Sequence, residues 1–156
     1  MAAAAVLLTT DLGPIRLSLR PDAAPRTVAH FVALVSSGAL SPCSFYRSDF
    51  VIQFGLHGSG KSSPLPPLPV NESGKLSNLK GAVAVAHWDV PDCGNSEFFV
   101  SIVDSPHLDS AFGGYCVFAQ VPAVDAQSWA TISAIAASIA SRPGSVVKVS
   151  RVEVVA

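Results

Sequence analysis

An arginine, a glutamine and several aromatic side chains recur on neighbouring strand-like segments of this sequence. Arg47 and Gln53 lie in the runs Phe45–Arg47 and Phe50–Gln53, and a pair of adjacent aromatic residues, Phe98-Phe99, lies in a later β-like run. A guanidinium group offers only hydrogen-bond donors and stays charged at neutral pH, and aromatic side chains line most small-ligand pockets. The combination suits an apolar pocket with one cationic donor at its rim.

Residues 55–62, Gly-Leu-His-Gly-Ser-Gly-Lys-Ser, fit the phosphate-binding pattern G-x-x-x-x-G-K-[ST] and follow a predicted strand. That loop holds phosphate only when a helix begins at its lysine. Four prolines between Pro64 and Pro69 follow instead, and proline removes the N–H groups that a helix needs. We therefore interpret the match as a chance feature, and we expect an extended surface loop over residues 58–69.

The histidines and cysteines form no recognisable metal or nucleophile motif. The four histidines lack the i, i+4 pairing of a metal-binding helix, and the three cysteines include no C-x-x-C pair. His107-Leu108-Asp109 is not accompanied by a G-x-S-x-G elbow, which disfavours a hydrolase. We expect free thiols in a reducing compartment, no metal ion and no cofactor.

Length and composition favour a compact domain over a membrane or nucleic-acid protein. The chain has 156 residues, 49% of them hydrophobic and 13% charged, with a net charge of −1. We expect a single domain over residues 1–156 with its own core. The charge gives no basis for binding nucleic acid or an anionic membrane, and no apolar run reaches the roughly 20 residues of a membrane span. Met1–Leu8 lacks the basic segment of a secretory signal, so we expect a cytoplasmic protein, with a processed organellar form left open.

Apolar periodicity predicts eight strands and two helices. A helix over Pro25–Ser37 places Val28, Phe31, Val32 and Val35 on one buried stripe. The other expected elements are the strands Val6–Thr9, Ile15–Leu19, Phe45–Arg47, Phe50–Phe54, Gly81–Ala86, Phe98–Ile102, Val117–Val121 and Val146–Val155, and a helix over Asp125–Ser141. Because βαβ alternation is absent, the pattern predicts a mainly β fold, a closed eight-stranded antiparallel β-barrel capped by two α-helices.

Several short motifs follow one another in a fixed order along nearly the whole chain. They are Leu12–Leu19 with Ala24–Phe31, Phe45-Tyr46-Arg47, Phe50-Val51-Ile52-Gln53, Asn71-Glu72, Leu76–Ala86, Glu97-Phe98-Phe99 and Gly114–Val121. Each is weak alone, but their order and spacing together resemble the cyclophilins, the peptidyl-prolyl cis-trans isomerases, and most closely their bacterial-type branch.

The resemblance implies a role for each matching position. The catalytic set is Arg47, whose guanidinium acts on the substrate, with Gln53, which orients it or holds the substrate backbone, and Phe50. The substrate-binding set that the resemblance implies is Val51, Ala86, His87, Glu97, Phe99, His107, Leu108 and Tyr115. Because successive side chains of a strand point to opposite faces, we expect Phe98 in the core and Phe99 in the proline pocket.

The implied chemistry agrees with what an arginine beside an apolar pocket can do. Rotation about a peptide bond has a barrier of roughly 18–20 kcal/mol because of amide resonance, and before proline both isomers are populated. Twisting the bond localises a lone pair on the prolyl nitrogen. A guanidinium aimed at that nitrogen stabilises the twisted state more than either planar state, as catalysis requires.

The sequence also departs from the family pattern. Only Ser48 and Asp49 separate Arg47 from Phe50, where the family has four residues, and we expect Asp49 to pair with Arg47. Glu97 replaces a glutamine and is expected to add negative charge to the groove. Val51 is smaller than the usual methionine, and His107 replaces a tryptophan or phenylalanine.

We interpret the chain as a peptidyl-prolyl isomerase that assists protein folding. The alternative is a divergent, non-catalytic module that binds Xaa-Pro segments or serves as a structural subunit of a larger assembly. The expected partners are proline-containing peptides and protein clients, and cyclosporin-type inhibitors with weakened affinity because of His107. We expect a monomer that binds neither nucleic acid nor membrane.

Overall fold

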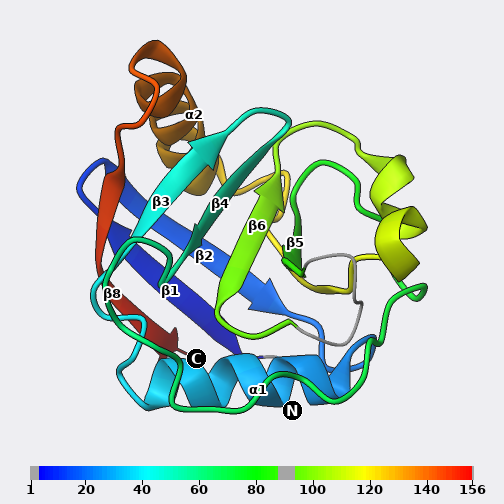
Figure 1. Cartoon of the computed structure of the whole chain (residues 1–156). Coiled ribbons are helices and arrows are strands. Elements are labelled where there is room, and N and C mark those ends of the chain that lie inside the picture. The colour runs from blue at the N-terminus through cyan, green and yellow to red at the C-terminus, as the bar shows by residue number, and fades with distance from the viewer. Residues whose placement is uncertain (1–3, 88–93, 156) are drawn as a thin grey trace.

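The computed structural model describes residues 4–87 and 94–155, and its strands close into an antiparallel barrel (Figure 1). The order around the barrel is β1-β2-β7-β5-β6-β4-β3-β8. The strands are β1 (Ala5–Thr10), β2 (Gly13–Leu19), β3 (Cys43–Ser48), β4 (Val51–Gly55), β5 (Ala82–Val85), β6 (Glu97–Ser101), β7 (Val117–Gln120) and β8 (Val147–Val155). The helices are α1 (Pro25–Ser36) and α2 (Ala126–Ser141), with short 3₁₀ turns η1 (Pro106–Asp109) and η2 (Ala111–Gly113).

The predicted fold is confirmed, and the expected elements agree with the observed ones to within two residues at each end. One of these shifts affects the site: β4 begins at Val51, so Phe50 lies in the turn after β3 and not in a strand. Helix α2 begins at Ala126, because Asp125 is its cap and accepts a hydrogen bond from the Ser128 N–H at 3.0 Å.

Helix α1 lies across one side of the barrel and α2 on the opposite side (Figure 1). The buried face of α1 contains Thr27, Val28, Phe31, Leu34 and Val35. Val32, expected on the buried stripe, is only partly buried because the stripe is centred on Phe31, about 100° away around the helix.

A cluster of phenylalanines fills the barrel interior. Phe31 of α1 packs edge-on against Phe98 of β6, with ring centroids 4.8 Å apart, and against Phe118 of β7 at 4.9 Å. Phe54 of β4 also contacts Phe98, at 5.6 Å. Each of these four side chains is fully buried. Phe98 also meets Phe118, with centroids 5.8 Å apart. Because it contacts three other rings, it links α1 to β4 and β7.

The neighbouring residue, Phe99, belongs to a different apolar cluster on the outer face of the barrel. That outer cluster consists of Val51, Ala82, Ala84, Phe99, Leu108 and Val117, with Phe50, Leu76, Ala86 and Tyr115 packed against it. The expectation that Phe98 and Phe99 point to opposite faces is therefore confirmed. The strands around β6 bury side chains on both faces, and the outer face forms the floor of the candidate site.

We predict that Phe98→Ala destabilises the fold by about 3–5 kcal/mol, because it removes the ring at the centre of the phenylalanine cluster. Urea unfolding measures the change. Val154→Ala is the matched control, since that side chain is 41% exposed and its removal is expected to cost no more than about 0.5 kcal/mol. Equal effects of the two substitutions would contradict the central place given to Phe98.

Candidate functional site

The structure contains a cavity of about 420 Å³ on the outer face of the barrel. It is lined by Arg47, Phe50, Val51, Gln53, Ala86, His87, Glu97, Phe99, His107, Leu108, Ala111, Phe112 and Tyr115. All of the residues that the sequence marked as catalytic or substrate-binding are in this set, brought together from three strands and three loops. Sequence analysis missed Ala111 and Phe112, which carry no motif.

A β-bulge in β3 brings Arg47 to the cavity. Phe45 pairs with Phe54 of β4, but Arg47 pairs with Gln53, so Tyr46 is one residue too many on β3. In a regular strand Arg47 would share the face of Phe45, which is fully buried in the core. The extra residue reverses the alternation. Arg47 therefore lies beside Gln53 on the outer face, although Ser48 and Asp49 leave only a short connection.

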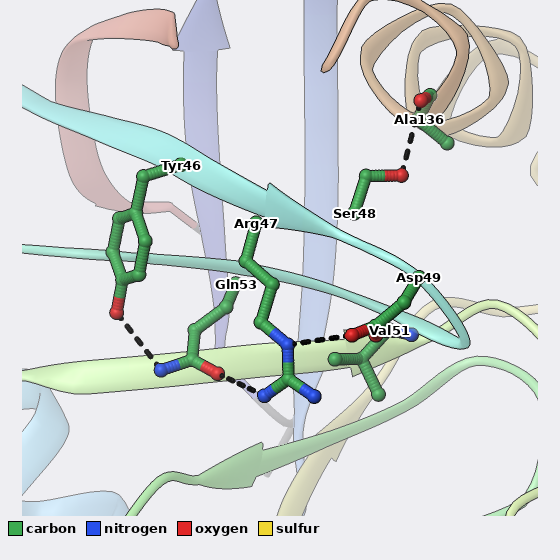
Figure 2. Close-up of polar contacts among 7 residues, drawn as sticks. All are labelled: Tyr46, Arg47, Ser48, Asp49, Val51, Gln53 and Ala136. Carbon is green, nitrogen blue, oxygen red and sulfur yellow. Dashed lines mark hydrogen bonds and ion pairs between the residues drawn. The ribbon is translucent and has the colours of Figure 1, made fainter. Parts of the chain in front are cut away.

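Two neighbours hold the Arg47 side chain (Figure 2). Its Nε donates to Asp49 Oδ2 at 2.9 Å, and its Nη1 donates to Gln53 Oε1 at 3.2 Å. The Cζ atom lies 5.6 Å from the centroid of the Phe50 ring. Within the described residues Nη2 makes no hydrogen bond, which leaves one edge of the guanidinium available to a ligand.

The expected pairing of Asp49 with Arg47 is thus confirmed, but the ion pair is exposed. Both side chains are 44% accessible, and such pairs contribute only about 0–1 kcal/mol. Asp49 has a second task in the turn, because its Oδ1 accepts a hydrogen bond from the Val51 N–H at 3.1 Å. The carboxylate therefore shapes the shortened connection while it holds the arginine.

Glu97, which is expected from the sequence to add negative charge to the groove, lines the cavity with a carboxylate that is hydrogen-bonded within the chain. Four donors within the chain contact it. They are the Tyr46 hydroxyl at 2.8 Å, the Leu56 N–H at 3.0 Å, the His57 N–H at 3.2 Å and the Ser96 hydroxyl at 2.8 Å. A carboxylate offers about four acceptor sites, so these four donors occupy the group.

Aromatic and imidazole rings form the far wall of the cavity. The rings of His87 and Tyr115 stack with centroids 4.2 Å apart, and Tyr115 packs edge-on against Phe99 at 5.6 Å. The His87 Nε2 lies 2.8 Å from the Gly114 carbonyl oxygen. His107 is exposed and lies 5.3 Å from the Phe50 ring. The wall is therefore aromatic, and its imidazole and phenol groups add polar atoms.

The loop that carries His107 and Leu108 is held by the Asp109 carboxylate. Its Oδ1 accepts hydrogen bonds from the backbone N–H of Asn78 at 2.7 Å and from its side-chain amide at 2.8 Å, and its Oδ2 accepts one from the Ser77 hydroxyl. Burial alone would raise the pKa of Asp109, but the hydrogen bonds from Ser77 and Asn78 outweigh it and hold the pKa below its ordinary value. Asp109 is therefore a structural carboxylate beside the pocket.

Phe112 is the most exposed phenylalanine at the cavity, with 61% of its surface accessible. Its backbone has φ = 51° and ψ = 36°, the left-handed region that bulky residues avoid. Such a conformation costs about 1–2 kcal/mol, so placing this ring at the rim lowers the stability of the fold.

The other motifs that the sequence raised do not form sites in the described residues. Lys61 of the phosphate-loop match donates to the carbonyl oxygens of Ala39 and Pro42, and no helix begins there. No cluster of three or more metal-ligating side chains occurs in the described part of the chain. Cys43 and Cys116 are buried free thiols, while Cys93 lies outside the described residues. A search of the described helices finds none with the length and apolarity to cross a bilayer.

Comparison with known proteins identifies the family. Residues 5–154 match the family model of cyclophilin type peptidyl-prolyl cis-trans isomerases. The chain is 35% identical over 124 residues to peptidyl-prolyl cis-trans isomerase A of Dickeya dadantii, covering 74% of this chain and 64% of that protein. It is 33% identical over 125 residues to peptidyl-prolyl cis-trans isomerase B of Escherichia coli, covering 74% and 76%. The chain therefore belongs to the cyclophilin-type peptidyl-prolyl cis-trans isomerase family, and its relatives include bacterial proteins, as the motifs indicated.

Two further comparisons define how far the likeness extends. The chain matches 64% of the length of the Dickeya protein and 57% of a peptidyl-prolyl cis-trans isomerase of Arabidopsis thaliana, so it spans less than two thirds of both. A cyclophilin type isomerase of Cryptosporidium parvum, solved in the presence of the dipeptide Ala-Pro, superposes with a TM-score of 0.79 at 21% identity, covering 97% of this chain and 99% of that one. This likeness confirms the fold.

We predict that Phe112→Gly leaves the protein about 1 kcal/mol more stable than Phe112→Ala, because glycine relieves the left-handed strain that alanine retains. The two substitutions remove the same exposed ring and differ only in the Cβ atom, so each is the control for the other. Urea unfolding compares the two variants. Equal stability would show that the backbone at this position is unstrained.

Proposed function

We propose that this protein is a peptidyl-prolyl cis-trans isomerase that accelerates rotation about Xaa-Pro bonds in protein substrates and so assists their folding. The observation that carries the proposal is the placement of the Arg47 guanidinium at the rim of an apolar cavity, held by Asp49 and Gln53 with Nη2 available. Family membership supports the same reaction.

The floor of the cavity suits a prolyl ring. Val51, Phe99 and Leu108 are buried side chains of the outer cluster and carry no hydrogen-bonding group. Proline is the one residue whose side chain replaces the backbone N–H, so its ring can enter an apolar pocket without leaving a donor unpaired. We assign these three residues, with Phe50, to the proline pocket.

The residues around the floor suit the peptide backbone on either side of the proline. Ala86, His87, Tyr115, His107 and Phe112 line the cavity beside the floor. Their aromatic rings offer apolar contact to an extended peptide, and their imidazole and hydroxyl groups offer hydrogen bonds. The substrate is therefore a short extended segment with its proline at the floor of the cavity.

In the proposed reaction Arg47 acts as the catalytic donor. As the Xaa-Pro bond twists, the prolyl nitrogen loses conjugation and gains a lone pair, which the guanidinium can bind. The same donor finds no lone pair in either planar isomer, so it stabilises the transition state selectively. One preorganised donor of this kind is worth about 3–4 kcal/mol. No covalent bond is made or broken, and Gln53 contributes by holding Nη1.

A second candidate function is a non-catalytic module that binds Xaa-Pro segments, alone or within a larger assembly. The Arg47–Asp49 ion pair favours it, because the carboxylate competes with the substrate for the guanidinium. The exposure of both side chains favours catalysis instead, since solvent weakens the competition. A protease-coupled assay with a short proline peptide separates the two functions.

We predict that Arg47→Ala lowers kcat/KM for a proline peptide by about 10²–10³-fold, the effect of losing one preorganised donor, with little change in stability. Arg151→Ala is the matched control, because Arg151 makes an equally short ion pair, 2.9 Å to Glu153 within β8, and does not line the cavity. A folded Arg47→Ala protein with wild-type turnover would remove Arg47 from the mechanism and leave the binding module as the better function.

We further propose that cyclosporin-type inhibitors bind this cavity with weakened affinity, because the family contacts them through an indole where this chain has His107. His107→Trp is expected to tighten inhibition by about tenfold or more, the worth of one added aromatic contact, while turnover of a proline peptide changes little. An inhibition assay on the two proteins measures this. Wild-type inhibition that is already as tight as in the tryptophan variant would contradict the assignment.

We also propose that the protein acts as a monomer in the cytoplasm. A monomer suffices because every residue lining the cavity comes from one chain. Burial is the main cause that raises the pKa of the Cys43 thiol to about 12, so this thiol stays protonated and unreactive at neutral pH. Unpaired thiols are typical of reducing compartments, which supports the cytoplasmic location.

A further inference from the structure

A chain of three hydrogen bonds joins Glu97 to the proposed catalytic arginine. Arg47 Nη1 donates to Gln53 Oε1 at 3.2 Å, Gln53 Nε2 donates to the Tyr46 hydroxyl at 2.8 Å, and that hydroxyl donates to Glu97 Oε1 at 2.8 Å. Figure 2 shows the first two bonds, with the amide of Gln53 lying between the tyrosine and the arginine. We call this chain the Glu97–Arg47 relay.

The direction of every bond in the relay is determined by its two ends. A carboxylate can only accept, so the single proton of the Tyr46 hydroxyl must go to Glu97. That hydroxyl can then only accept from Gln53, which turns the NH₂ group of the amide toward Tyr46 and the carbonyl oxygen toward Arg47. A guanidinium can only donate, so this orientation satisfies the other end too. An amide that could otherwise be flipped is held in one orientation.

The acceptor end of the relay is fixed independently of the pocket. Both oxygens of Glu97 receive backbone N–H groups, from Leu56 and His57. This approach is possible because residue 55 is glycine, with φ = 152°, and a Cβ atom there would lie 2.4 Å from Glu97 Oε1. The carboxylate therefore occupies a cradle of backbone donors at the end of β4, and it does not depend on a substrate for its position.

The surroundings of Tyr46 hold its ring in place and keep its hydroxyl protonated. Its ring packs on His57 with centroids 4.8 Å apart. Burial first, and then the charge of Glu97, raises the pKa of its hydroxyl well above the ordinary value, so the group stays protonated as a donor at any pH the protein meets. Tyr46 is also the extra residue of the β3 bulge, which explains how it reaches Gln53 from the strand that carries Arg47.

We propose that Glu97 and Tyr46 are positioning residues that act on Arg47 through Gln53. Resting on the isomerase function proposed above, the inference assigns to Glu97 the task of orienting the Gln53 amide so that its oxygen holds Nη1, while Asp49 holds Nε. With two of its three nitrogens held, the guanidinium presents Nη2 in one direction. Glu97 thus serves the reaction from outside the substrate, in place of the direct substrate contact that the family pattern implies.

The two roles for Glu97 give different kinetics. A positioning residue lowers kcat, because the misplaced donor fails in the transition state, and leaves KM nearly unchanged. A residue that touches the peptide changes KM, and does so whether or not Tyr46 keeps its hydroxyl. The test therefore uses Tyr46→Phe, Glu97→Gln and the double variant, with kcat and KM measured on one proline peptide.

We expect Tyr46→Phe and Glu97→Gln each to lower kcat by about three- to tenfold, the worth of one hydrogen bond, with KM within about twofold of wild type. In the Tyr46→Phe background, Glu97→Gln is expected to have no further effect on kcat, because the relay is already broken. Ser96→Ala is the matched control, since it removes a donor from the other oxygen, Glu97 Oε2, and it is expected to keep wild-type kinetics. Additive effects of the two relay substitutions, or a change mainly in KM, would overturn the proposal.

NMR supplies a readout that is independent of turnover. Tyr46→Phe is expected to shift the side-chain NH₂ signals of Gln53 and the Nε–Hε signal of Arg47, and Glu97→Gln to shift both, while Ser96→Ala shifts neither. If the wild-type protein fails to accelerate any proline peptide, the isomerase function is wrong, and these signals alone decide the relay. Unmoved Gln53 and Arg47 signals in folded Tyr46→Phe protein would overturn it.

Discussion

The β-bulge at Tyr46 is the constraint on which the candidate site depends. Without it, Arg47 would follow Phe45 into the phenylalanine cluster, where a guanidinium without partners would cost several kcal/mol. With it, three polar side chains from two strands, Tyr46, Arg47 and Gln53, meet on the outer face. The bulge also lets a connection of only two residues, Asp49 and Phe50, join β3 to β4 without burying the arginine. A local irregularity thus compensates for a shortened loop.

The barrel supports the site because its strands around β6 are apolar on both faces. The inner face holds Phe98 in the main core, and the outer face holds Phe99 in the pocket floor. A strand fixed by packing on both sides moves little, so the residues at its edges keep their distances. The rim differs from this buried floor, because its side chains Arg47, His107 and Phe112 are exposed to solvent. The site therefore combines a rigid apolar floor with a solvated polar and aromatic edge.

The barrel, its two helices and most of the residues that line the cavity could be predicted from the sequence, because the alternation of the strands and the order of the motifs are retained in this chain. The bulge could not be predicted, since it changes hydrogen-bond pairing and leaves no mark in side-chain type. Tyr46 was missed for the same reason. Glu97 was assigned to the groove as an added charge, because the sequence does not reveal that the backbone of residues 56 and 57 folds around it. Phe112 could not be predicted because a left-handed backbone is normally recognised in a sequence by glycine, and this position has phenylalanine instead.

The close approach of Gly55 to Glu97 has an evolutionary consequence. A side chain at position 55 would collide with the carboxylate and with the Ser96 carbonyl oxygen, which would lie 2.2 Å from the new Cβ atom. Because the Ser96 carbonyl is part of the backbone, position 55 must stay glycine whichever side chain stands at position 97. Position 97 is less restricted, since a side chain with an acceptor oxygen can still receive an N–H group from residues 56 and 57, whereas a hydrocarbon side chain leaves both groups without a partner. Evolution is therefore expected to hold position 55 constant and to exchange only acceptor-bearing residues at position 97.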